Sequence, residues 1–348
     1  MKRKYVLVLA LVAASLAGLA FQGCRKDPDT GRLPADAISF TVPAGWPQPV
    51  YTFLNNPLST DGFELGRRIF YDTRLSRDNT ISCASCHQQF AAFANINHIV
   101  SHGVDSKIGT RNSPGLFNLA WQPAFFWDGG VNHIESQPIN PIENLVEMDL
   151  KIDSVVARLG ADADYKARFG KVFGDEAVSS QRIFKALAQF MGAMVSSNAK
   201  WDKVQRGETS FTATENAGQL VYVQHCATCH QAPLFSDFSY RNNGLKPIPG
   251  ADDSGRMHIT HNIADLHKFK VPSLRNLQYS PPYTHDGRFA TIDEVLDHYD
   301  HGIQPSASLD PALQNGIQLT SQERSDLKAF LATLNDETFV KDKRFAQP

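Results

Sequence analysis

The chain has 348 residues, a formal net charge of −2 at pH 7 and 42% hydrophobic residues. This near-neutral balance excludes a nucleic-acid binder or a strongly basic protein of the membrane surface, because both need clustered positive charge. The length is enough for two domains of ordinary size, each with its own core.

The N-terminus has the layout of a secretory signal. Basic residues at 2–4 precede an apolar run over 5–21, and Gly23 and Cys24 follow. The run is at the short limit for a membrane span of ~20 residues, so a retained anchor is the second choice. Cys24 stands where a bacterial lipoprotein signal places its lipidated cysteine, whereas ordinary cleavage near Gly23 is the alternative. We expect residues 1–24 to be a signal and lipoprotein segment of an exported, periplasmic protein.

A tether and a helix are predicted next. Residues 25–57 contain six prolines and little helical periodicity, which is typical of a tether. The segment 61–72 places Phe63, Leu65 and Ile69 at helical spacing and leads toward the first cysteines.

Four of the five cysteines fall in two copies of C-x-x-C-H, the attachment pattern of c-type haem. The thiols of such a motif add to the haem vinyl groups, and the histidine becomes an axial iron ligand. A redox dithiol or half of a zinc site would explain a single copy. A zinc site built from all four cysteines would leave both histidines unexplained. We therefore predict two covalently bound c-type haems, held by Cys83, Cys86, His87, Cys226, Cys229 and His230.

Similar surroundings of the two motifs indicate a two-unit repeat. A helix over 212–224, with a capping box of Thr212 and Glu215, precedes the second motif. Amphipathic helices over 180–199 and 320–334 are expected to close the two units, and the polar stretch 201–210 to link them. The predicted fold is mainly α, with two cytochrome c-like haem domains packed against each other. They span 58–207 and 208–348, and the long loops 95–118 and 234–277 cover the haem faces.

Further motifs carry a family resemblance. LGRRIFYDTRLS at 65–76, RNSP at 111–114, FFWDG at 125–129, KVPSLRN at 270–276 and PPYTHDGRF at 281–289 accompany the two haem motifs. Over 58–334 this pattern resembles the bacterial di-haem cytochrome c peroxidases and their relatives. These relatives include the di-haem enzyme that matures a tryptophan-derived quinone.

The resemblance implies a peroxidatic haem in the first domain and an electron-transfer haem in the second. It makes Glu147, twenty residues after Trp127, the catalytic carboxylate, and Gln137, ten residues after Trp127, its companion in the pocket. Trp127 itself would lie between the haems. Without the resemblance, Glu147 would be interpreted as a solvated carboxylate and Trp127 as a core aromatic.

The remaining axial ligands stay open. His102 matches the distal histidine that many family peroxidases place before RNSP; His98 and an open position are alternatives. For the second haem, Tyr299 lies fourteen residues after His285, where peroxidases place methionine and the quinone-maturing relative a tyrosine. We expect residues 293–299 to form a helix that presents it, and keep Met257 and His298 as alternatives.

The resemblance also implies a calcium ion between the domains. Its ligands would be the side chain of Asn112 and the backbone carbonyls of Ser280 and Pro282, and calcium prefers such oxygen ligands. Serine replaces the usual threonine at 280, a change that a carbonyl ligand tolerates.

The expected activity is reduction of hydrogen peroxide to water. Electrons would come from a small donor protein, a cytochrome c or cupredoxin, and pass from the C-terminal to the N-terminal haem. One alternative is a di-haem enzyme that oxidatively modifies a partner protein, and another is a non-enzymatic di-haem electron carrier. Association into a homodimer is also left open.

Overall fold

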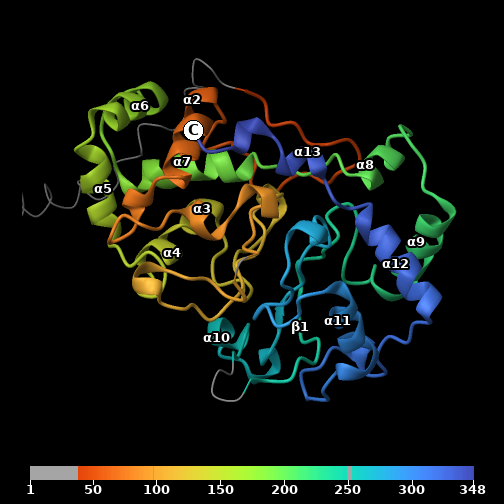
Figure 1. Ribbon diagram of the computed structural model, residues 1–348. Helices are drawn as coiled ribbons and strands as arrows, with labels where there is room; N and C mark the ends of the chain where they lie inside the picture. The colour runs from red at the N-terminus through yellow and green to blue at the C-terminus, as the bar shows by residue number, and fades with distance from the viewer. Residues whose placement is uncertain (1–37, 97, 249–252) are drawn as a thin grey trace, which may run out of the picture.

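The computed structural model describes residues 38–96, 98–248 and 253–348. Figure 1 shows two helical bodies side by side, the first coloured orange to green and the second green to blue. In the described part the only named strands are β1 (Tyr240–Arg241) and β2 (Phe269–Lys270), which pair antiparallel. The mainly helical fold is therefore confirmed. The predicted signal segment, Cys24 included, lies outside the described residues.

The first domain is built on two packed helices. Helix α2 (Thr60–Phe70) begins at Ser59, whose hydroxyl accepts the backbone N–H of Gly62, and packs against α7 (Ser180–Gly192). The helices cross at a glycine, because a Cβ on Gly66 would stand 1.9 Å from the carbonyl oxygen of Ala186. Helix α7 ends earlier than the predicted residue 199. The chain turns there, and Ser196 donates its N–H to the Asn118 side chain at 2.8 Å.

The second domain repeats this arrangement. Helix α9 (Ala213–His225) packs against α12 (Ser321–Ala332). Both begin with a capping box, the predicted one at Thr212 and another at Thr320. A Cβ on Gly218 would stand 1.9 Å from the carbonyl oxygen of Asp326, so the helix crossing again needs a glycine. The structure thus confirms the two-unit repeat.

Shorter helices complete the two domains. The predicted polar link holds helix α8 (Lys200–Gln205), since Asp202 accepts the N–H of Ala199 and starts a helix there. The others are α3 (Cys83–Cys86), α4 (Ile139–Glu143), α5 (Ile152–Gly160), α6 (Ala163–Phe173), α8 (Lys200–Gln205), α10 (Met257–Thr260), α11 (Ile292–Asp297) and α13 (Glu337–Val340).

The end of the predicted tether packs against both domains. Trp46 lies against Trp121 of the first domain, with ring centroids 5.0 Å apart, and under the guanidinium of Arg275 from the second, 4.9 Å away. The indole of Trp121 donates to the carbonyl of Pro47 at 2.8 Å. Buried aromatic surface therefore holds this segment, and residues 38–57 are a packed strap rather than a free linker.

The C-terminal tail returns to the first domain, as Figure 1 shows for α13 and the chain end. Phe339, Val340 and Phe345 join the first hydrophobic core, and Tyr71 donates to the carbonyl of Phe345 at 2.7 Å. The prediction that 208–348 form the second domain does not describe this tail, because its apolar side chains complete the other core. Among the residues described, no helix is long and apolar enough to cross a bilayer.

Candidate functional site

The first C-x-x-C-H motif is held on a single helical turn. Helix α3 carries Cys83 and Cys86, and His87 follows it directly. Nδ1 of His87 lies 2.8 Å from the carbonyl oxygen of Phe93, which leaves Nε2 for a metal. Burial lowers the pKa of His87 to about 4, so the ring is neutral at pH 7 and able to bind iron.

The second motif has the same construction. Cys226 caps α9, and Nδ1 of His230 lies 3.0 Å from the carbonyl oxygen of Pro272. Burial lowers the pKa of His230, and the Tyr222 hydroxyl donates to the His230 carbonyl at 2.5 Å. Each domain therefore presents two thiols and one oriented, neutral imidazole.

The four thiols fit covalent haem attachment. All four are free, and burial raises the pKa of both Cys83 and Cys226 to about 12. Within the described ranges, no group of three or more Cys, His, Asp or Glu is placed to hold a metal ion. A zinc site shared by the cysteines is therefore excluded there, whereas iron brought in by a haem needs only the axial histidine from the protein.

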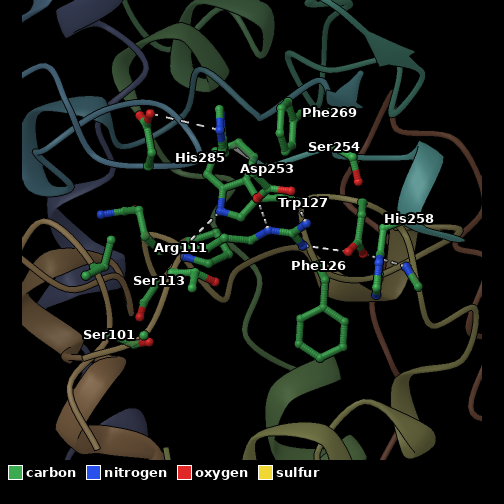
Figure 2. A pocket seen from close by; sticks show the side chains of 18 of the residues that line it. Ser101, Arg111, Ser113, Phe126, Trp127, Asp253, Ser254, His258, Phe269 and His285 are labelled. Carbon is green, nitrogen blue, oxygen red and sulfur yellow. Dashed lines mark hydrogen bonds and ion pairs between the residues drawn. The ribbon is translucent and has the colours of Figure 1, made fainter. Parts of the chain in front are cut away.

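A cavity of about 970 Å³ extends from His87 between the domains to Asn243 and Arg288. Figure 2 shows Ser101 and Ser113 at one end of this cavity, Trp127 and His285 beside it, and His258 at the other end. A smaller cavity of about 60 Å³ adjoins Cys83 and Cys86 and shares His87, Gln137 and Glu147 with the large one. Together these spaces lie where a haem attached to the first motif would be held.

Glu147 and Gln137 come together at this cavity. Gln137 caps the turn Ile134–Ser136, and Glu147 lies in the loop after α4, held by its N–H to the Asn144 carbonyl at 3.0 Å. Both side chains line the two cavities. Burial raises the pKa of the Glu147 carboxyl, which suits a group that must take up and release a proton.

Two hydrogen-bond partners of Glu147 were not predicted. The Ser101 hydroxyl donates to Oε1 of Glu147 at 3.3 Å, and the Asn144 side chain also bonds to this carboxyl. Both bonds favour the ionised form and oppose the effect of burial. Asn144 had a sequence signal, since an asparagine three residues before the carboxylate is typical of a tight turn.

His102 lies at the edge of the smaller cavity. Its carbonyl accepts the Cys86 thiol at 3.6 Å, and its ring stacks on that of His98, with centroids 3.9 Å apart. The next residues bind the loop that carries Glu147, because Val104 donates its N–H to the carbonyl of Glu147 at 2.8 Å. His102, not His98, is thus among the residues that line this cavity.

Trp127 lies between the two domains. Its indole nitrogen donates to the carbonyl of Asn112 at 2.9 Å, and its ring centroid is 6.5 Å from that of His285 in the second domain. Its carbonyl accepts the N–H of Lys270 at 2.7 Å. Both domains therefore fix the position of this indole.

Tyr299 is half-buried near the second pair of thiols. Its phenol interacts electrostatically with Cys226 and Cys229, and burial raises its pKa. Helix α11 ends at Asp297, and Tyr299 lies in the π-helical turn His298–Gly302 that follows. The predicted single helix over 293–299 is wrong at this point. A π turn is rare and frequently found at functional sites.

The two alternatives to Tyr299 are placed differently. Nε2 of His298 lies 2.9 Å from the carbonyl oxygen of Asn243 and is occupied by that hydrogen bond. Met257 begins α10, next to Arg256, whose guanidinium donates to the carbonyl of Asp128 at 2.8 Å. Met257 therefore follows directly on a residue that bonds across the contact between the domains.

The residues predicted to bind calcium lie on both sides of this contact. Asn112 donates its side-chain N–H to the carbonyl of Ile99 at 3.0 Å, which makes its side-chain oxygen the atom available to a cation. It also donates its backbone N–H to the carbonyl of His285. Ser280 and Pro282 both shortly precede His285 in the chain, and the Ser280 hydroxyl donates to the backbone carbonyl of Asn276 at 3.3 Å.

Fold and site together define a c-type cytochrome with two haem-binding domains. The family model of di-haem cytochrome c peroxidases matches residues 60–210, and that of cytochrome c matches 215–335. The chain belongs to the di-haem cytochrome c peroxidase family, which includes the MauG proteins. Its cofactors are c-type haems.

Relatives come from both branches of this family. The methylamine utilization protein MauG of Methylorubrum extorquens is 35% identical over 289 residues, which cover 81% of this chain and 80% of that protein. The cytochrome c551 peroxidase of Nitrosomonas europaea is 32% identical over 286 residues, covering 81% and 82%. A crystal structure of a MauG-like protein associated with microbial copper homeostasis has a TM-score of 0.83 and 33% identity, covering 90% of this chain and 99% of that one.

Proposed function

We propose that this protein reduces hydrogen peroxide to water with electrons from a small redox protein. The observation that carries the proposal is the cavity beside Cys83 and His87, which is lined by a half-buried carboxylate, Glu147, and a neutral amide, Gln137. A plain electron carrier has no need of a proton acceptor at this place.

The reaction consumes one peroxide, two electrons and two protons, and gives two water molecules. The haems supply the redox chemistry and the cleavage of the O–O bond. Glu147 takes the proton from one peroxide oxygen and returns it to the other, as general base and then general acid. Gln137 does not titrate at these pH values and orients the peroxide by hydrogen bonding.

Trp127 carries the electrons between the two haem sites, one at a time. Support comes from its place between the domains, with its indole bonded to Asn112 and its ring next to His285. The second domain receives each electron from the donor protein, a cytochrome c or a cupredoxin. The domain boundary between 207 and 208 stays a prediction.

We assign ligands on the same basis. Tyr299 binds the iron of the second site, which its closeness to Cys226 and Cys229 supports. His102 is the ligand that must leave the first site before peroxide binds, consistent with its place at the smaller cavity. Calcium binds to Asn112, Ser280 and Pro282.

A second candidate function is oxidative modification of a partner protein. It is favoured by Tyr299, because an anionic oxygen ligand lowers the haem potential and stabilises a more oxidised state. The similarity to MauG of Methylorubrum extorquens points the same way.

Stopped-flow mixing of the diferric and half-reduced protein with peroxide tests whether the chain is an enzyme. Steady-state turnover with a reduced cytochrome c then separates the two candidates. The proposed peroxidase turns over repeatedly, with two donor molecules oxidised per peroxide. A fast reaction with peroxide but no donor turnover would support protein modification. No reaction with peroxide would leave an electron carrier.

A further inference from the structure

Lys270 of the second domain reaches into the loop of the first domain that ends in Trp127. Its amine donates to the Gln122 side chain at 2.6 Å and to the carbonyl of Ala124 at 2.7 Å. Its backbone N–H donates to the carbonyl of Trp127 at 2.7 Å. One residue thus holds the loop 122–127 at three points across the domain contact.

No carboxylate pairs with this amine among the described residues. The carboxylate that acts electrostatically on Lys270 is Asp128, which is already paired with the guanidinium of Arg111 at 2.6 Å. Burial lowers the pKa of Lys270 to about 7, against the smaller, opposite effect of Asp128. A lysine that serves only solubility or a surface ion pair keeps its amine in water. A desolvated amine without a paired carboxylate therefore indicates that Lys270 has a specific role.

The indole of Trp127 depends on this contact. Its other anchors are the bond to the Asn112 carbonyl and the neighbouring His285 ring. Phe126, just before it, has a left-handed φ of 65°, a conformation that a phenylalanine keeps only when its surroundings enforce it. Without Lys270, residues 122–127 lose these three hydrogen bonds to the second domain. The ring contact of Trp127 with His285 remains, as do the bonds from Arg256 to the carbonyls of Asp128 and Gly129 just beyond the loop.

We propose that Lys270 is a positioning residue for electron transfer, which fixes the Trp127 indole between the two haem sites. The inference rests on the proposed function, in which Trp127 passes one electron at a time toward the first domain. In each step the second site is oxidised by one electron, the first is reduced by one, and the indole ends unchanged. Lys270 touches neither peroxide nor haem in this role.

The test uses the protein with both haems attached. The half-reduced protein is mixed with peroxide, and the oxidation rate of the second haem is followed optically in Lys270→Met, Trp127→Phe and a control, Lys268→Met. Lys268 lies two residues away and pairs with Asp265 at 3.2 Å. We expect Lys270→Met to slow this transfer at least ~10-fold, with both haem spectra and midpoint potentials unchanged, because small displacements of a positioned group are costly. Lys268→Met should behave as wild type.

A second variant covers the case in which Lys270→Met does not mature. Gln122→Leu removes one acceptor and leaves the lysine in place, and we expect a smaller loss of rate in the same direction. The wild-type rate should also change around pH 7, whereas the Lys270→Met rate should not. If Trp127→Phe transfers electrons slowly but Lys270→Met and Gln122→Leu transfer them at the wild-type rate, Lys270 has no positioning role and the proposed route stands. If Trp127→Phe also transfers at the wild-type rate, the route through Trp127 is wrong, and the role of Lys270 falls with it.

Discussion

At the scale of single residues, Glu147 and Lys270 share one physical feature. Glu147 lines both cavities and Lys270 lies in the contact between the domains, and burial disfavours the charged form of each. Glu147 keeps two neutral hydrogen-bond partners, and Lys270 keeps two neutral acceptors. The pKa of each group is therefore shifted toward neutral pH, which lowers the stability of the fold but suits a functional group.

The stability of the protein should depend on pH through Lys270. Below about pH 7 its amine is charged in both the folded and the unfolded chain, and the cost of burying the charge is fully present. Between pH 7 and the ordinary value of 10.5, the unfolded chain binds the proton that the folded protein has released, so stability rises with pH. The denaturation midpoint of the wild type, relative to that of Lys270→Met, should therefore rise as the pH increases across this range. A constant difference between the two would contradict the lowered pKa.

The ligand role of Tyr299 can be tested by Tyr299→Phe. If the phenolate binds iron, the variant should change the optical and EPR spectra of the second haem and raise its midpoint potential. The first haem should still react with peroxide. Tyr279→Phe, which alters a tyrosine packed against the other core, serves as the control. An unchanged spectrum in Tyr299→Phe would mean that Tyr299 is a structural residue and not an iron ligand. A methionine–iron band that disappears in Met257→Leu would identify Met257 as the ligand.

At the scale of elements, each haem domain depends on one helix crossing that only glycine permits. Gly66→Ala should lower the free energy of unfolding by ~1–3 kcal/mol, because its Cβ would meet the Ala186 carbonyl oxygen at 1.9 Å. Gly170 in α6 is a matched control, since a Cβ there meets nothing closer than 3.4 Å. Gly170→Ala should raise stability by up to ~1 kcal/mol through helix propensity. Equal effects in denaturant titrations would refute the crossing argument.

The sequence predicts those elements best whose signals are local. Helices α2, α9 and α12 lie within about two residues of their predicted bounds, because capping residues and apolar spacing act within one helix. The strap 38–57 and the tail at α13 were not predicted, since their conformation is set by partners far along the chain.

The same distinction holds at the site. The family resemblance, matched at its spacing from Trp127, led to Gln137 and Glu147, and both line the smaller cavity. Ser101 and Lys270 had no local signal, because their partners lie 46 residues and more than 140 residues away.

At the scale of the whole molecule, the two domains are interlocked. The strap lies against both domains and the tail returns from the second to the first. Arg111 spans the contact with ion pairs to Asp128 and Asp253, each at 2.6 Å. A buried network of Ser196, Asn276 and Asp336 adds neutral and charged bonds at the junction. The two domains are therefore joined at several separate places.

We propose that the exported protein is anchored to the membrane through lipid on Cys24. Cys24→Ser removes the residue that would carry the acyl chains, and two or more such chains give firm attachment. The variant should then move from the membrane to the soluble exported fraction. Cell fractionation with detection of covalent haem measures this. Wild-type protein that already fractionates as soluble would place Cys24 in a discarded signal.

Peroxidase turnover of Glu147→Gln tests the central claim most directly. The amide keeps the shape of the side chain but cannot move a proton, so turnover with a reduced donor should fall at least ~10²-fold, with both haem spectra unchanged. The matched control is Glu143→Gln, which alters a carboxylate that accepts the N–H of Ile152 at 3.0 Å, away from both cavities. It should retain wild-type turnover. Near-normal turnover of Glu147→Gln would remove Glu147 from the mechanism and contradict the account of this site.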